Sequence, residues 1–88
     1  MKIKDGFILR PFGDAYIAVS VSEKNPNIAV SLNGLGAFIW HKLESQTTFE
    51  QILSDITDTY EVDREKAQSD LENCIETLKK AQILDLKE

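Results

Sequence analysis

Histidine and cysteine, two residue types often used for catalysis and metal binding, each occur only once in this chain. His41 is the only histidine, and no serine, cysteine or carboxylate stands around it at the spacing of a known triad or metal motif. We therefore expect His41 to occupy a solvated helix position. Cys74 is the only cysteine, and its place on an apolar helical stripe predicts a small hydrophobe instead of a reactive thiol. The sequence thus predicts no catalytic residue, no metal site and no cofactor.

Two further features could serve a ligand. Gly34-Leu35-Gly36 precedes a predicted helix, but it lacks the additional glycine or lysine of a phosphate-binding loop. A flexible junction between a strand and a helix is the simpler interpretation. Phe38 and Trp40 could line a pocket, yet aromatic residues at helical spacing in so small a protein are expected in the core.

Composition narrows the class of protein. The 88 residues fit a single domain spanning residues 1–88, and 15 acidic against 10 basic side chains give a net charge of −5. Between Lys42 and Arg64 every charged side chain is acidic, which would repel the phosphates of a nucleic acid. The start of the sequence lacks the apolar region of a secretory signal, and no apolar run approaches the roughly 20 residues that span a bilayer. We expect a cytoplasmic protein that binds neither nucleic acid nor membrane.

The first third of the sequence predicts strands at Phe7–Arg10, Tyr16–Val21 and Ile28–Leu32, and a three-stranded antiparallel meander is the simplest arrangement. The two outer edges of such a sheet differ. Pro11 blunts the first, because proline donates no hydrogen bond. The third strand contains neither proline nor charge. An unprotected edge is either covered by the chain's own helix or kept free for a guest strand, and both alternatives remain open.

The remaining two-thirds predicts three helices, which begin after the N-cap residues Asn33, Thr48 and Asp63, with Gln51 completing a capping box with Thr48. The second is expected to end at Tyr60. Ile83, Leu84 and Leu86 are expected to pack the tail against the core. The apolar stripes of the helices are Leu35, Phe38, Ile39 and Leu43; Phe49, Ile52, Leu53, Ile56 and Tyr60; and Ala67, Leu71, Cys74, Ile75 and Leu78.

The run Leu32-Asn33-Gly34-Leu35-Gly36-Ala37-Phe38-Ile39-Trp40 resembles the hallmark of the PqqD-like family, and the order of elements in the whole chain is similar to that family. The resemblance implies an α+β fold, a three-stranded antiparallel β-meander followed by three helices in a winged helix-turn-helix-like arrangement. Gln82 stands where the family usually has a glycine that ends the third helix.

The resemblance also implies a function. PqqD-like proteins are recognition elements in the biosynthesis of ribosomally synthesised and post-translationally modified peptides. They bind the leader segment of a precursor peptide as an added strand, between the third strand and the third helix, and present it to a modifying enzyme, often of the radical-SAM class. Carried onto this sequence, the peptide-binding residues would be Ile28, Ala29, Val30, Ser31 and Leu32 on the strand, and Lys66, Asp70, Asn73, Cys74 and Thr77 on the helix.

Several alternatives stay open. The polar stripe on the third helix is equally well explained as an ordinary solvated face. The protein could be a peptide chaperone of pyrroloquinoline quinone (PQQ) biosynthesis, although the Gly-Ala-Phe-Ile-Trp helix start is closer to the generic recognition elements. It could also be a protein-protein interaction module unrelated to peptide modification. A DNA-binding winged helix is disfavoured, because acidic residues outnumber basic ones along Asp63–Lys80.

Overall fold

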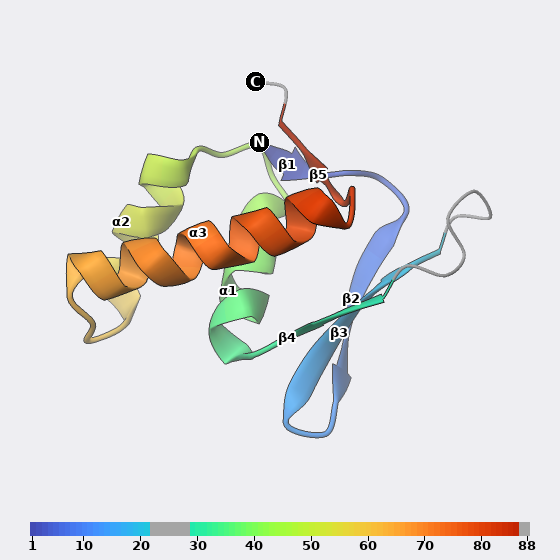
Figure 1. Ribbon diagram of the computed structural model, residues 1–88, viewed down its shortest axis with the longest axis horizontal. Helices are drawn as coiled ribbons and strands as arrows, with labels where there is room; N and C mark the ends of the chain where they lie inside the picture. Colours follow the sequence, from blue (N-terminus) through green and yellow to red (C-terminus); the bar gives the residue numbers. More distant parts are fainter. Residues whose placement is uncertain (22–28, 87–88) are drawn as a thin grey trace.

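A three-stranded antiparallel sheet forms the first part of the molecule (Figure 1). The computed structural model describes residues 1–21 and 29–86, and the sheet has the order β2-β3-β4. Leu9, Ala18 and Val30 lie side by side across it, which confirms the predicted meander. The three strands are β2 (Phe7–Phe12), β3 (Ala15–Ser20) and β4 (Ala29–Leu32).

The strand boundaries differ slightly from the prediction. β2 continues through Pro11 to Phe12 instead of ending at Arg10, which an edge strand tolerates because one side of its backbone needs no partner. β3 begins and ends one residue earlier than predicted. Ile28, predicted to open the third strand, lies outside the described residues.

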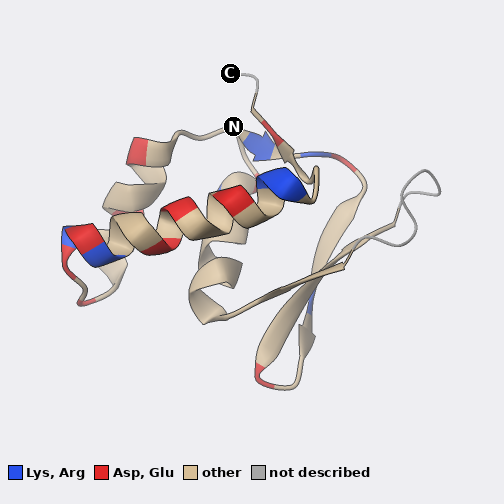
Figure 2. Cartoon of the chain, viewed as in Figure 1, with Lys and Arg blue, Asp and Glu red and all other residues tan. Residues whose placement is uncertain are grey.

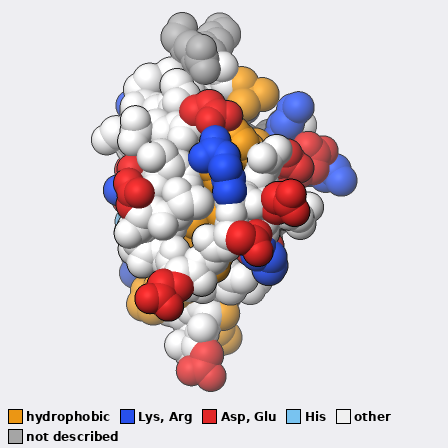
Figure 3. Space-filling model, turned by 90° about the vertical axis from the view of Figure 1, so that its left-hand side faces the viewer, with side chains coloured by type: hydrophobic (Ala, Val, Ile, Leu, Met, Phe, Trp, Pro, Cys, Tyr) orange, Lys and Arg blue, Asp and Glu red, His pale blue; other side chains and the backbone are white. Residues whose placement is uncertain are grey.

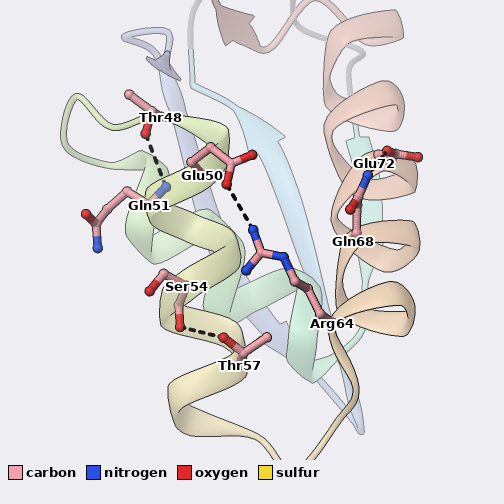
Figure 4. Close-up of polar contacts among 8 residues, drawn as sticks. All are labelled: Thr48, Glu50, Gln51, Ser54, Thr57, Arg64, Gln68 and Glu72. Atoms are coloured by element: carbon pink, nitrogen blue, oxygen red, sulfur yellow. Dashed lines mark hydrogen bonds and ion pairs between the residues drawn. The ribbon is translucent and has the colours of Figure 1, made fainter.

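Three helices follow the sheet: α1 (Gly34–Leu43), α2 (Phe49–Thr59) and α3 (Arg64–Lys80). All three predicted N-caps are confirmed, because each side-chain oxygen accepts a hydrogen bond from the backbone N–H three residues on. The distances are 2.8 Å from Gly36 to Asn33, 3.1 Å from Gln51 to Thr48 and 2.8 Å from Lys66 to Asp63. Figure 4 shows the Thr48 cap, and beside it Arg64 at the start of α3 donates to Glu50 of α2 at 3.1 Å.

The core lies between α1, α2, α3 and the inner face of the sheet. Trp40 is 1% exposed, so its predicted core position is confirmed. Tyr60 is not on the buried stripe, because it caps the C-terminus of α2 and is 38% exposed. Its ring meets the ring of Phe38 edge to face, with 5.3 Å between the two ring centroids. The largest of the side chains that are less than 2% exposed are Trp40, Ile39, Leu43, Ile52, Leu53, Ile56, Leu71, Leu78 and Ile83.

A second, two-stranded sheet that the sequence did not predict joins the two ends of the described chain. β1 (Lys2–Ile3) pairs antiparallel with β5 (Leu84–Asp85), and the N–H of Lys4 donates to the carbonyl of Ile83 at 2.8 Å. Figure 1 shows this pair beside the end of α3. Ile83 and Leu84 are buried as expected, but the expectation for Leu86 is wrong, since it is 48% exposed.

α3 ends at a left-handed residue that is not glycine. Gln82 has φ 61°, its N–H donates to the carbonyl of Lys79, and the N–H of Ile83 donates to the carbonyl of Leu78, both at 3.0 Å. This pair of bonds is the Schellman motif, with Leu78 and Ile83 as its buried apolar partners. The helix therefore ends in a Schellman motif with glutamine, instead of glycine, at its left-handed position.

The charges gather on the helices and on the termini, while the sheet carries few (Figure 2). Arg10 is the only charged residue in β2, β3 and β4. Among the described residues, no helix is both long and apolar enough to cross a membrane.

Candidate functional site

A cavity of about 360 Å³ lies between the end of β4, the start of α1 and one face of α3. It brings together most of the residues that the sequence analysis selected. Ser31 and Leu32 line it from the strand side. All five residues selected on the third helix line it from the opposite side: Lys66, Asp70, Asn73, Cys74 and Thr77.

The strand side continues from the cavity as an open sheet edge. β4 pairs with β3 on one side, and no other strand among the described residues pairs with its second side. Ala29 and Val30 belong to this edge but do not line the cavity. The edge therefore offers unpaired backbone groups next to a hollow that can accept a side chain.

Sequence reasoning missed the floor of the cavity. Leu35 and Ile39 of α1 line it, with Asn33 and Gly36. The sequence had predicted a buried stripe for Leu35 and Ile39, a helix cap for Asn33 and a flexible junction for Gly36. They fall in the run Leu32–Trp40 that carries the family resemblance, which was the available signal. The apolar side chains give the cavity a hydrophobic base under a polar α3 wall.

Gly36 has a packing role at this floor, so the expectation of a merely flexible junction is wrong. A Cβ atom on Gly36 would lie 2.9 Å from Cβ and 3.3 Å from Cδ2 of Leu32. Real Cβ atoms almost never show a contact as short as 2.9 Å, so only glycine allows α1 to approach the end of β4 this closely. By contrast, a Cβ atom on Gly34 would meet nothing within 4 Å.

The α3 wall carries its polar groups in a row. Lys66 Nζ lies 2.8 Å and 3.0 Å from the two carboxylate oxygens of Asp70. This ion pair spans one turn of the helix. Thr77 Oγ1 donates to the carbonyl of Asn73 at 2.9 Å. The side chain of Asn73 forms no hydrogen bond with another described residue, so both its donor and its acceptor can reach a guest.

Cys74 lies on the same wall, half-buried and with a free thiol. Burial raises the pKa of this thiol from 9.0 to about 11, because the low-dielectric surroundings disfavour the thiolate. At neutral pH the group is an uncharged small hydrophobe, which agrees with the sequence analysis.

The other candidate residues lie apart from this cavity. His41 is exposed on α1, and its Nδ1 lies 2.7 Å from Oε1 of Glu44, in agreement with the predicted solvated position. Phe38 and Trp40 do not line it either; Phe38 is half-buried and Trp40 belongs to the core. Within residues 1–21 and 29–86, no three His, Cys, Asp or Glu side chains lie together as a metal site would require.

A protein-family model matches the part of the sequence that forms β4, the start of α1 and α3. Residues 18–84, which include β4 and every helix, match the model of Coenzyme PQQ synthesis protein D (PqqD). The chain belongs to the PqqD family. No curated protein sequence matches this PqqD-family chain.

Two solved structures resemble the PqqD-family chain. The first is "TbiB1 in Complex with the TbiA(beta) Leader Peptide", whose matching chain is 25% identical in sequence to this chain, with a TM-score of 0.77. The match covers 100% of this chain and 99% of that chain. "Lasso peptide synthetase B1 complexed with the leader peptide" is 18% identical, with a TM-score of 0.68, over 90% of this chain and 89% of that one. The second likeness concerns the fold alone.

Proposed function

We propose that this PqqD-family chain is an adaptor that binds the leader segment of a precursor peptide by strand addition and presents it to a separate modifying enzyme. The observation that carries the proposal is the unpaired edge of β4 beside the cavity under α3. Family membership supports it, as does the likeness to TbiB1, a protein whose solved structure holds a leader peptide.

Strand addition explains how one short edge can hold an extended peptide. Backbone hydrogen bonds along β4 supply affinity that depends little on sequence, and pockets beside the edge select alternate side chains. In this protein the cavity between Leu32 and α3 would receive one such side chain, with Leu35 and Ile39 at its base. The free amide of Asn73 is placed to bind the backbone or a polar side chain of the guest.

We assign no catalytic group to the adaptor. The thiol of Cys74 is protonated at neutral pH, and the imidazole of His41 is paired with Glu44 outside the cavity. The chemistry would belong to the partner enzyme, such as a radical-SAM enzyme. The leader would be held on β4 while the segment to be modified extends into the enzyme.

A peptide chaperone of PQQ biosynthesis is the second candidate, because the description of the matching family names PQQ synthesis. The geometry of the site is the same in both cases, so the identity of the peptide decides between them. A neighbouring gene for a short precursor and a modifying enzyme would identify the pathway.

DNA binding is disfavoured by the surface charge. Two of the basic side chains of α3 are engaged, Arg64 with Glu50 and Lys66 with Asp70. Figure 3 shows acidic side chains spread among basic ones on the face at the α2 and α3 end of the molecule, with no continuous basic patch on that face. Phosphate binding requires a basic surface.

The proposal is tested by titrating the labelled protein with the leader peptide of a precursor encoded beside it. Proline is introduced at Ala29 and at Val30 in separate variants, because backbone groups of neighbouring residues in a strand point to opposite edges. One variant should keep its circular dichroism spectrum and lose binding, since it lacks an N–H that faces the guest. If both stay folded and bind like the parent, the peptide does not pair with β4.

The α3 wall is tested separately with the same peptide. Asn73→Ala removes the free amide at the cavity and should weaken binding about three- to tenfold, as expected for one hydrogen bond of about 1 kcal/mol. Gln68→Ala is the matched control, because Gln68 lies on α3 outside the cavity and its side chain donates to Glu72. Equal affinities for both variants would remove Asn73 from the site.

A further inference from the structure

The outer face of the sheet, opposite the core, is apolar where a solvated face would be polar. Side chains alternate between the two faces of a strand, and the inner face of β2, β3 and β4 carries Leu9, Ala18 and Val30, which pack on the core. An antiparallel sheet with one face in water normally alternates apolar with polar residues. Here the outward positions are Ile8, Arg10, Phe12, Ala15, Ile17, Val19, Ala29 and Ser31.

The register places these outward residues in rows across the strands. Ile8, Val19 and Ala29 form one row, which we call the outer row. Arg10, Ile17 and Ser31 form the next. The outer row is entirely apolar, and it ends on β4 at Ala29, whose side chain is a single methyl group. Ile8 and Val19 are only half-buried, and Ala29 is exposed.

A strand added to β4 would extend both rows by one residue. Adjacent strands lie about 4.8 Å apart, so the guest residue opposite Ala29 would stand about 10 Å from Val19 with only a methyl group between them. A long apolar or aromatic side chain can cross that gap and cover Val19, whereas a short one leaves it exposed to water. The row of Ser31 gives no such preference, because it contains a hydroxyl and the Arg10 guanidinium.

We propose that the leader peptide is recognised on both faces of the added strand, with a long apolar or aromatic residue opposite Ala29 packing across it onto Val19. The inference rests on the proposed function, because it assigns the outward side of the same bound peptide. The cavity residue and the outer-row residue of the guest point to opposite faces. They are therefore separated by an odd number of positions in the peptide sequence.

The probe is a displayed library of twelve-residue random peptides, selected on the full chain. We keep the peptides that bind the parent protein but do not bind the proline variant that stays folded, since these peptides pair with the edge of β4. Their affinities are then measured for Val19→Thr, which exchanges a methyl group for a hydroxyl of similar shape. Ile8→Thr is the matched control, because Ile8 lies in the same row, one strand further from the guest, and is half-buried like Val19.

We expect the kept peptides to share two apolar positions at odd spacing. Val19→Thr should weaken their binding about three- to tenfold, the loss expected when a hydroxyl replaces one methyl group in the covered contact, and Ile8→Thr should leave it unchanged. Selection on Ala29→Val should shift the outer position to smaller residues, because the added methyl groups fill the gap.

Each other result has a distinct meaning. Equal affinities for the parent, Val19→Thr and Ile8→Thr would overturn the inference and leave strand addition intact. Equal losses in both variants would also overturn it, because the effect would then be a general weakening of the sheet. If no selected peptide depends on β4, the proposed function itself fails, and this inference with it.

Discussion

Gly36 lies so close to Leu32 that a Cβ atom on Gly36 would stand 2.9 Å from the Cβ atom of Leu32. The contact joins the last residue of β4 to the first turn of α1, at the floor of the cavity. The atom that would have to move is next to the backbone, so rotation of the leucine side chain cannot relieve the overlap. The position of the sheet edge relative to the cavity therefore depends on this glycine.

Gly36→Ala should consequently destabilise the protein by about 1 to 3 kcal/mol, the usual range for overpacking a buried contact. Gly34→Ala is the control, because its Cβ atom would meet nothing within 4 Å and alanine is the better helix former; it should be neutral or stabilising by up to about 1 kcal/mol. Urea unfolding measures both. Equal effects would show that helix propensity, and not the contact with Leu32, governs this junction.

The elements that the sequence predicted well are those with local signals. Asn33, Thr48 and Asp63 each accept a hydrogen bond from a residue three positions away, so the residues that decide a helix start lie within one turn of each other in the sequence. The meander likewise follows from alternation and short connections. The α3 side of the cavity was selected through the family resemblance, and the structure gathers those residues at one wall.

The features that were missed depend on distant partners. Ile3 pairs with Leu84, and no local pattern indicates that two residues at each end of the chain will form a sheet. Tyr60 has the spacing of the α2 stripe, but the helix ends at Thr59 and the ring turns to Phe38 instead of the core. Gly36 was interpreted without knowledge of its neighbour Leu32 in space, which only the fold supplies.

Replacing Gln82 with glycine should stabilise the protein. Gln82 has φ 61°, a left-handed conformation that is unfavourable for a residue with a Cβ atom. Gln82→Gly removes that strain while keeping the Schellman hydrogen bonds, and the expected gain is about 1 kcal/mol. Ala81→Gly is the control, since Ala81 has φ −78° and should lose stability. Urea midpoints that fall for both variants would contradict the assignment of strain to Gln82.

Trp40 should be the most sensitive aromatic residue in the chain. It is 1% exposed in the core, so Trp40→Ala should destabilise the protein by about 3 to 5 kcal/mol through lost burial and a cavity. Phe12→Ala is the control, because Phe12 is 71% exposed and should change stability by less than about 0.5 kcal/mol. Thermal and urea unfolding compare the two, and a change below about 1 kcal/mol for Trp40→Ala would remove Trp40 from the core.

Cys74 should react slowly with alkylating reagents while the protein is folded. Its pKa is raised to about 11, and the thiolate is the reactive form. At pH 8 the folded protein should therefore react with iodoacetamide about a hundredfold more slowly than a short peptide that carries residues 71–77, whose thiol has an ordinary pKa. Comparable rates would show that the thiol is not shielded at the cavity wall.

The same shift in pKa makes the stability of the protein depend on pH in the alkaline range. Because the folded state holds the thiol proton up to a pKa of about 11 and the unfolded state releases it near 9.0, the folded state binds more protons between these values. The contribution of Cys74 is fully present below pH 9 and is lost as the pH rises to about 11. Relative to Cys74→Ala, whose unfolding lacks this titration, the free energy of unfolding should fall by about 2 to 3 kcal/mol across that interval. A difference between the two proteins that stays constant from pH 8 to pH 11 would contradict burial of the thiol as the cause of its raised pKa.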